Sequence, residues 1–274
     1  MNEESKPDER QQRWQSEASF FDEYYEPVRL LDPATLKRYS PPHRKRFNKE
    51  FRFHLLGDLK GKTVLDVGCG DGTNAVTLAA LGARVTGIDI SPKSIELARE
   101  RAQVNGLSDR VEFICKPLEL ADLAPGSFDV AWGDAILHHL ISDLDGILDR
   151  IAACVKPGGL MIFSEPVNFN RVLRRIRFMV PVHTDVTPDE RPLEKGEVRI
   201  IAKHIAGLRL RRFALFGRLD RFILPNYNYE RASAIRRAIV NTLALTDALL
   251  LALPGIRSMA GTAVFYGTPS GAKR

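Results

Sequence analysis

The chain has 274 residues, of which 44% are hydrophobic and 27% are charged, a composition typical of a globular protein with a core of its own. Its three cysteines, Cys69, Cys115 and Cys154, are too few and too widely spaced for a disulfide framework or a zinc site, so we expect a reducing cytoplasm and no metal site. The formal net charge of +6 comes from residues 166–274, where 19 Lys or Arg outnumber 8 Asp or Glu, and this excess fits a solvated face, an anionic membrane, nucleic acid or an acidic substrate.

The N-terminal part differs in character from the rest of the chain. Residues 1–15 are polar and charged, without the apolar run of a secretory signal, and are expected to be a disordered start. Residues 16–60 are aromatic and helical in pattern and are interrupted by Pro41-Pro42. We expect them to form a helical lid over a main domain at 61–270. Aromatic residues in such a segment more often pack than bind substrate, so we expect packing roles for Tyr24, Tyr25 and Tyr39.

From residue 62 onward, apolar runs of strand length alternate with amphipathic helical stretches. The strands are expected at 63–67, 83–90, 110–115, 127–133, 160–165, 208–217 and 261–268. The helices between them are expected at 73–82, 91–106, 144–156, 197–208 and 232–253. This order predicts an α/β fold with a doubly wound, seven-stranded, mostly parallel sheet whose last strand is antiparallel.

A glycine-rich turn follows the first predicted strand, with glycines at Gly68, Gly70 and Gly72. Glycine permits unusual dihedral angles and lets a ligand approach the backbone. The dinucleotide fingerprint would need a further glycine where Thr73 stands, which disfavours a pyrophosphate. Asp89 ends the second strand, where a carboxylate can accept hydrogen bonds from ribose hydroxyls. The pattern therefore predicts an adenosine-containing ligand that is not held through phosphates.

Four motifs in order carry a resemblance to a known family: VLDVGCGDG (64–72), VTGIDIS (85–91), SFDVAWGDAILHHL (127–140) and VKPGGLMIFSEP (155–166). They resemble the successive motifs of class I S-adenosylmethionine-dependent methyltransferases, which have a Rossmann-like fold. Within that class the chain is similar to the UbiE/BioC-like (methyltransferase type 11/25) group of small-molecule and lipid methyltransferases. The resemblance implies S-adenosylmethionine as cofactor and S-adenosylhomocysteine as product.

The resemblance also implies roles for individual residues. Asp66 and the backbone at the three glycines would hold the amino-acid part of S-adenosylmethionine, Asp89 the ribose, and Ile90 the adenine. Pro117 stands where the family commonly has an Asp or Asn beside the adenine amino group, so the adenine would lie against Leu118 and backbone groups. Asp134 would face the place where the methionine end and the acceptor meet.

Methyl transfer from a sulfonium needs a general base only if the acceptor must lose a proton. The candidate catalytic residues are His139, His138, Asp134 and Glu165. For each histidine the alternative is a packing or capping role. For Glu165 we expect either a contact with the substrate or a contact with the residues that bind the substrate. The favoured function is therefore methylation of an O, C or N nucleophile on a small or lipid-like metabolite by in-line displacement.

Substrate specificity is expected in residues 10–50 and in two insertions, at 166–195 and 220–255. The first insertion contains a basic cluster that fits an anionic substrate, an anionic membrane or a solvated face: Arg171, Arg174, Arg175 and Arg177. In the second, the apolar helix at 232–253 is too interrupted to span a bilayer. It fits an apolar wall for the substrate or peripheral membrane contact.

Three rival functions remain open at this point. A nucleic-acid methyltransferase would suit the basic C-terminal part, but WGDA (132–135) differs from the (D/N)PPY motif of adenine N-methylating enzymes, and we find no RNA-binding module. A non-catalytic scaffold would not need the glycine loop together with Asp89. A nicotinamide oxidoreductase is disfavoured by Thr73. The oligomeric state is not readable from the sequence.

Overall fold

The computed structural model describes residues 14–15, 18–19, 28–170, 175, 191–224 and 228–271. Tyr24 and Tyr25, three of the four arginines in the predicted basic cluster and most of the first insertion lie outside these residues. Arg175, the fourth arginine, is exposed. Residues 14–15 have helical backbone, within the segment expected to be a disordered start.

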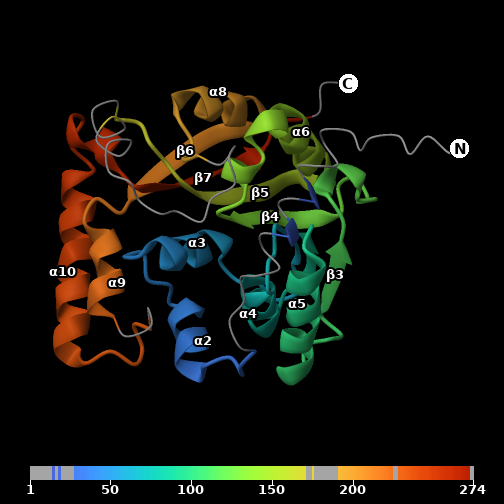
Figure 1. The fold of residues 1–274 in the computed structure, drawn as a ribbon, viewed down its shortest axis with the longest axis horizontal. Coiled ribbons are helices and arrows are strands. Elements are labelled where there is room, and N and C mark those ends of the chain that lie inside the picture. Colours follow the sequence, from blue (N-terminus) through green and yellow to red (C-terminus); the bar gives the residue numbers. More distant parts are fainter. Residues whose placement is uncertain are drawn as a thin grey trace, which may run out of the picture.

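The core of the protein is a seven-stranded sheet with the order β3-β2-β1-β4-β5-β7-β6 (Figure 1). The strands are β1 (Thr63–Val67), β2 (Arg84–Asp89), β3 (Val111–Cys115), β4 (Phe128–Asp134), β5 (Val155–Pro166), β6 (Ile205–Phe213) and β7 (Thr262–Pro269). β1 to β5 pair in parallel, and β7 runs antiparallel to both β5 and β6. The predicted fold class is confirmed, including the antiparallel last strand.

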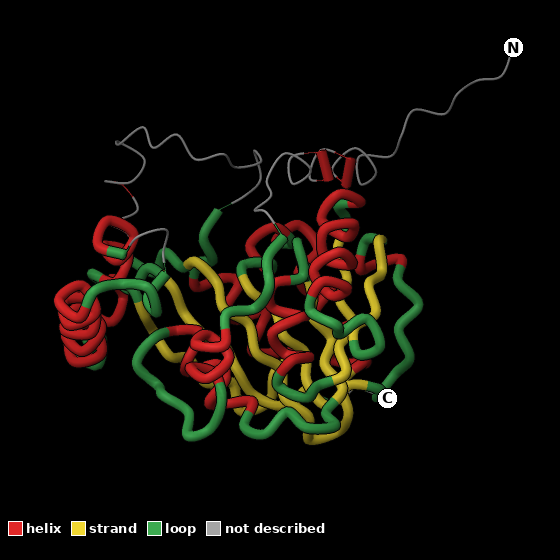
Figure 2. The backbone as a smooth tube through the Cα atoms, turned by 90° about the horizontal axis from the view of Figure 1, so that it is seen from below, coloured by secondary structure: helices red, strands yellow, loops and turns green. Residues whose placement is uncertain are grey.

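Helices cover both faces of the sheet, as buried parallel strands require. The α-helices of the main domain that the structure describes are α4 (Thr73–Ala80), α5 (Pro92–Val104), α6 (Leu144–Cys154), α8 (Lys195–His204), α9 (Asp220–Ile223) and α10 (Ala234–Leu250). One hydrophobic core joins the sheet to α4 and α5, and the other joins it to α6 and α8. Figure 2 shows the strands as a layer between helices, with α10 standing at one edge of the molecule.

Local signals set several helix boundaries. The Ser91 side chain accepts a hydrogen bond from the Ser94 amide at the start of α5, and Pro92 is the first helical residue. The Ser233 side chain likewise caps α10. In the described part of the chain, no helix is long and apolar enough to cross a membrane.

Several predicted boundaries were displaced, and strand pairing explains two of them. The helix expected at 197–208 ends at His204, and the strand expected at 208–217 begins at Ile205, because Ile205 and Ala206 already pair with β7. β5 begins at Val155 rather than at residue 160, since Val155 pairs with Phe128 ahead of an irregularity in register. Pairing with distant strands therefore sets where β5 and β6 begin. Neither the helical pattern nor the Pro-Gly-Gly turn indicated this pairing.

Within residues 28–62, two helices precede the sheet, α2 (Pro33–Tyr39) and α3 (Asn48–Leu56), on either side of Pro41-Pro42. The Phe53 side chain is buried against Trp132 of β4, with ring centroids 5.4 Å apart. Tyr39 stacks on Phe53 at 4.5 Å, which gives this tyrosine a packing role. The N-terminal helices are therefore part of the core on the α4–α5 side of the sheet.

Candidate active site

A cavity of about 380 Å³ lies at the carboxyl ends of β1, β2 and β4. We call it the donor cavity. Six of the predicted cofactor residues line it: Gly68, Gly70, Asp89, Ile90, Leu118 and Asp134. Both candidate histidines, His138 and His139, line it as well. Trp14, which the sequence pattern did not single out, also contributes to the wall.

The three glycines have different roles in the geometry. All have positive φ, of +66° at Gly68, +51° at Gly70 and +76° at Gly72. A Cβ on Gly70 would meet nothing within 4 Å, so this part of the loop presents open backbone to the cavity. A Cβ on Gly72 would lie 2.7 Å from the Cβ of Ala98, and Gly72 is not among the cavity-lining residues. Gly72 therefore allows α4 to pack closely on α5.

Asp89 holds the glycine loop in place. Its Oδ2 accepts a hydrogen bond from the Gly70 amide at 2.8 Å, and its Oδ1 accepts one from the Ser91 amide at 2.9 Å. A carboxylate can accept about four hydrogen bonds, so this anchoring is compatible with binding hydroxyl groups. The residue predicted to bind ribose thus also shapes the loop that it faces.

Asp66 is a buried carboxylate next to the cavity. It is 1% exposed, and its Oδ2 has no hydrogen-bond partner among the described residues. Burial, together with the nearby Asp134 charge, raises its pKa well above the usual range. Val67 and Gly68, the next two residues, line the cavity. An unpartnered buried oxygen at this place fits a ligand with an ammonium group, and S-adenosylmethionine carries one.

The far end of the donor cavity is apolar. Ile88, Ile90, Pro117 and Leu118 contribute to its lining. The described residues thus combine open glycine backbone, the carboxylates of Asp66, Asp89 and Asp134, and an apolar end. This set fits an adenosine attached to an amino acid.

Glu165 lies behind the cavity and holds its wall. It is completely buried and lines neither this cavity nor the second one described below. Its Oε1 accepts hydrogen bonds from the Ile136 and Leu137 amides, at 3.1 and 2.9 Å. Its Oε2 accepts one from the His138 amide at 3.3 Å and lies 2.9 Å from His138 Nδ1. Glu165 therefore fixes the 3₁₀ turn at Leu137–His139.

The two histidines lie next to each other on that turn, with ring centroids 4.1 Å apart. His138 is buried and is oriented by its contact with Glu165. Burial, followed by the neighbouring His138, lowers the pKa of His139 to about 3. The His139 ring is therefore neutral at pH 7.

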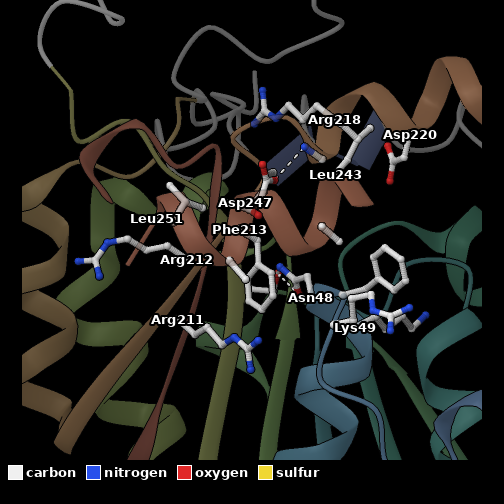
Figure 3. Close-up of a pocket in the computed structure, with 18 of the residues that line it drawn as sticks. Asn48, Lys49, Arg211, Arg212, Phe213, Arg218, Asp220, Leu243, Asp247 and Leu251 are labelled. Carbon is white, nitrogen blue, oxygen red and sulfur yellow. Dashed lines mark hydrogen bonds between the residues drawn. The ribbon is translucent and has the colours of Figure 1, made fainter. Parts of the chain in front are cut away.

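A second and larger cavity, of about 690 Å³, lies between α3, β6 and α10 (Figure 3). We call it the acceptor cavity. Asn48 and Lys49 line it from α3, Phe213 from β6, and Leu243 and Leu251 from the α10 side. The second predicted insertion therefore does contribute to a cavity wall.

Asp134 lines both cavities and is held there by its neighbours. Its Oδ2 accepts hydrogen bonds from Arg52 Nη2 at 2.9 Å and from Asn74 Nδ2 at 3.2 Å. Burial alone would raise its pKa, but the charges of Arg52 and Lys49 and these hydrogen bonds outweigh it and lower the pKa. The Arg52 guanidinium in turn lies 4.4 Å from the centroid of the Trp132 ring.

Sequence reasoning missed Lys49, Arg52 and Asn74. A signal was present for the first two, since residues 49 and 52 are three apart and share one face of α3. The contact of Arg52 with Asp134 could not be predicted from the sequence, because the two residues are 82 positions apart.

Comparison with known proteins shows which proteins the chain is similar to. The family model of a methyltransferase domain matches residues 58–194. A curated relative, the ubiquinone biosynthesis O-methyltransferase of Bordetella bronchiseptica, is 41% identical over 150 residues. The match covers 49% of this chain and 61% of that relative, so the chain spans about six tenths of the relative's length.

Two solved structures share the fold. Geranyl diphosphate C-methyltransferase from Streptomyces coelicolor aligns with a TM-score of 0.55 at 14% identity, over 94% of this chain and 98% of the other. Phosphoethanolamine N-methyltransferase 2 from Haemonchus contortus, in complex with S-adenosyl-L-methionine, aligns with a TM-score of 0.51 at 19% identity, over 77% of this chain and 49% of the other.

The matched family segment begins just before β1 and extends past β5, so it contains the glycine loop, Asp89, Asp134 and Glu165. These are the parts that build the donor cavity and its supporting wall. The chain therefore belongs to the methyltransferase domain family, in the class I type whose methyl donor is S-adenosylmethionine.

Proposed function

We propose that the protein transfers a methyl group from S-adenosylmethionine to an O, C or N nucleophile of a small or lipid-like metabolite, by in-line displacement. The observation that carries this proposal is that Asp134 lines both the donor and the acceptor cavity. A donor in one cavity and an acceptor in the other would meet at this residue.

In this proposal the donor cavity binds S-adenosylmethionine through the residues described above. The open backbone at Gly70 admits the ligand, the Asp66 carboxylate faces its ammonium group, and Asp89 accepts hydrogen bonds from the ribose. Ile90 and Leu118 lie against the adenine. When bound, the cofactor supplies a methyl group that is already activated on a sulfonium, so the protein has mainly to hold the two reactants in line.

The chain's own contribution is then positioning, which can lower a barrier by about 7–11 kcal/mol. Arg52 and Asn74 fix the Asp134 carboxylate, and Glu165 fixes the turn that carries both histidines. A His139 pKa of about 3 and a lowered Asp134 pKa make both groups weak bases at pH 7. We therefore assign Glu165 a positioning role, Asp134 the role of shaping the junction of the two cavities, and His138 and His139 that of shaping the wall of the donor cavity.

The parts outside the central sheet are proposed to cover the acceptor. Residues 16–60 would act as the lid, since α3 lines the acceptor cavity and Trp14, just before this range, lines the donor cavity. Residues 220–255 would form the opposite cover through α9 and α10.

The same α10 helix supports peripheral contact with an anionic membrane. Its outer side carries an apolar stripe of exposed residues: Ile235, Ile239, Leu245 and Leu249. Phe222 of α9 is 74% exposed, and Arg236 and Arg237 lie at the start of the stripe. Exposed apolar residues next to arginines suit the surface of an anionic bilayer.

Vesicle flotation tests the membrane contact. We expect the protein to float with vesicles of phosphatidylglycerol and phosphatidylcholine and to float less with phosphatidylcholine alone. Leu249→Asp should reduce flotation, whereas Val104→Asp, at an exposed apolar residue on α5, should not. Equal flotation of both variants would contradict the assignment.

Transfer of radiolabelled methyl from S-adenosylmethionine into a host-cell extract tests the main proposal. The extract is separated afterwards into organic-soluble, aqueous small-molecule, nucleic-acid and protein fractions. We expect label in one of the two small-molecule fractions. Asp89→Ala should abolish the transfer, and Asp109→Ala, at an exposed residue outside the cavities, should not. Label in nucleic acid would instead support an RNA methyltransferase.

Calorimetry with S-adenosylhomocysteine separates binding from transfer. A hydrogen bond to a charged group contributes about 1.5–3 kcal/mol, so Asp89→Ala should weaken binding at least about tenfold. Absence of binding by the unmodified chain would overturn the proposed cofactor. Binding without transfer into any fraction would favour the scaffold alternative.

A further inference from the structure

The acceptor cavity is strongly basic. Among the described residues that line it, eight are Lys or Arg and three are Asp. The basic residues are Arg38, Arg46, Lys49, Arg52, Arg211, Arg212, Arg218 and Arg257. A cavity lined in this way raises the local concentration of anions.

Two of the three carboxylates are already engaged. Asp247 accepts hydrogen bonds from the amides of Leu215, Phe216 and Gly217, at 3.0, 2.8 and 2.9 Å. Asp134 is paired with Arg52. For the third, Asp220, burial raises the pKa, which favours its neutral form relative to an exposed carboxylate. The acidic lining therefore does not balance the basic lining.

Lys49 and Arg211 make no ion pair with a carboxylate within 4.0 Å among the described residues. Lys49 lies over the Tyr39 ring, and burial lowers its pKa despite the nearby Asp134 charge. Arg211 lies 4.3 Å from the Phe51 ring centroid and donates a hydrogen bond to the Lys45 carbonyl. Burial lowers the pKa of Arg211 as well. Two partly buried cations thus line the cavity without a carboxylate in ion-pair contact, and Asp134 acts on Lys49 only from a greater distance.

The other side of the cavity is apolar. Leu243, Ala244, Ala248 and Leu251 line it from the α10 side, and Phe213 lines it from β6. Figure 3 shows Lys49 and Arg211 on the α3 and β6 side of the pocket, with Leu243 on α10 and Leu251 just after the end of that helix. The volume of about 690 Å³ is large enough for a ligand with both a charged group and an apolar body.

We propose that the acceptor is an amphiphilic acid, with an anionic group on the α3 and β6 side of the cavity, where Lys49 and Arg211 lie, and an apolar chain or ring against α10. This inference rests on the proposed methyltransferase function, because it names the class of molecule that the enzyme methylates. The shared chemistry is a carboxylate, sulfonate or phosphate joined to a hydrocarbon body.

A matched pair of fluorescent probes tests the charge requirement directly. 8-Anilinonaphthalene-1-sulfonate and N-phenyl-1-naphthylamine share one apolar body and differ by the sulfonate. Both are titrated into the full chain saturated with S-adenosylhomocysteine. We expect the sulfonate probe to bind at least about tenfold more tightly than the neutral probe, with one site per chain.

Three variants locate the binding site. Lys49→Met and Arg211→Gln should each reduce the preference for the sulfonate at least about threefold. Ala244→Trp, which places a large side chain in the cavity, should weaken binding of both probes. Arg209→Gln is the matched control, because Arg209 is an exposed arginine on the same strand and does not line the cavity. Circular dichroism and S-adenosylhomocysteine affinity show whether each variant is folded.

The possible results separate this inference from the proposed function. Equal binding of the two probes by the unmodified chain overturns the inference, and so does a sulfonate preference that Arg209→Gln reduces as much as Arg211→Gln. Failure of S-adenosylhomocysteine to bind overturns the proposed function, and the probes can still be compared without it. A sulfonate preference that depends on both Lys49 and Arg211 supports the inference when S-adenosylhomocysteine also binds, and without that binding it overturns the acceptor role and leaves only the ligand class of the cavity.

Discussion

Arg52 and Asp134 form a 2.9 Å ion pair at the place where the donor and acceptor cavities meet. Arg52 is nearly buried, with a side chain 4% exposed, whereas the Asp134 side chain is 30% exposed. The pair connects the N-terminal helix α3 to the end of the central strand β4. It therefore joins the proposed lid to the reaction site.

Removing one partner of this pair should destabilise the protein. Arg52→Met leaves the Asp134 carboxylate without its ion-pair partner, and breaking a fully buried pair costs about 3–5 kcal/mol. Because Asp134 is partly exposed, we expect roughly 2 kcal/mol. Urea unfolding measures this loss. The double variant Arg52→Met with Asp134→Asn should recover part of it, and a double variant no more stable than Arg52→Met would contradict the explanation.

The glycine loop offers a test that separates binding from stability. Gly70→Ala and Gly72→Ala both place a side chain at positive φ, which costs about 1 kcal/mol. The Gly70 side chain would enter open space at the donor cavity, so its main effect should be weaker binding of S-adenosylhomocysteine. The Gly72 side chain would press on Ala98, so its main effect should be a lower free energy of unfolding.

Calorimetry and urea unfolding on the same two glycine variants provide the comparison. Gly106→Ala is the reference for positive φ alone, since Gly106 has a φ of +66° and a Cβ on it would meet nothing within 4 Å. The assignment fails if Gly72→Ala is no less stable than Gly106→Ala.

Glu165 provides a test of positioning against catalysis. Glu165→Gln replaces an acceptor oxygen with an NH₂ group that faces backbone N–H donors, and a buried unsatisfied polar group costs about 1–3 kcal/mol. We expect lower stability, reduced methyl transfer and an unchanged pH dependence of kcat. Urea unfolding and a pH–rate profile measure the two effects. Unchanged stability with a flattened pH profile would instead identify Glu165 as a general base.

The buried Asp66 carboxylate should lower the stability of the protein at pH 7 and strengthen the binding of the cofactor. Its folded-state pKa is raised by burial, so its contribution to stability is complete below the unfolded-state pKa of about 3.9 and is lost as the pH rises through the folded-state value. Asp66→Asn should therefore raise the Tm at pH 7 and have little effect on it near pH 3. For a chain of this length, 1 kcal/mol corresponds to about 2–4 °C.

Thermal unfolding over a series of pH values tests the Asp66 prediction, with Asp109→Asn as an exposed control. S-adenosylhomocysteine binding by Asp66→Asn should be weaker, because the ammonium group loses its carboxylate. A variant that is less stable than the parent at pH 7, or that binds equally well, would contradict the proposed role.

Periodicity and turn residues were sufficient to predict the sheet and most of its helices. Ser91, Pro92 and Gly106 bracket one helix through interactions within a few residues, and such local chemistry is readable from order alone. The donor cavity was predictable for a related reason. In a doubly wound sheet the carboxyl ends of parallel strands converge, so Gly68, Gly70 and Asp89 had to come together once their strands were recognised.

The sequence by itself therefore determined the fold class and the donor end of the site, through motifs that each occupy a short stretch. Only the tertiary structure decided what lies around the acceptor. Lys49, Arg211 and Leu243 come from three elements that are far apart in the chain and meet only when α3 and α10 pack beside the sheet. The tertiary structure likewise showed that Glu165 is buried beneath a turn. The sequence could not show this, because burial and hydrogen-bond partners depend on packing across the fold rather than on neighbours in sequence.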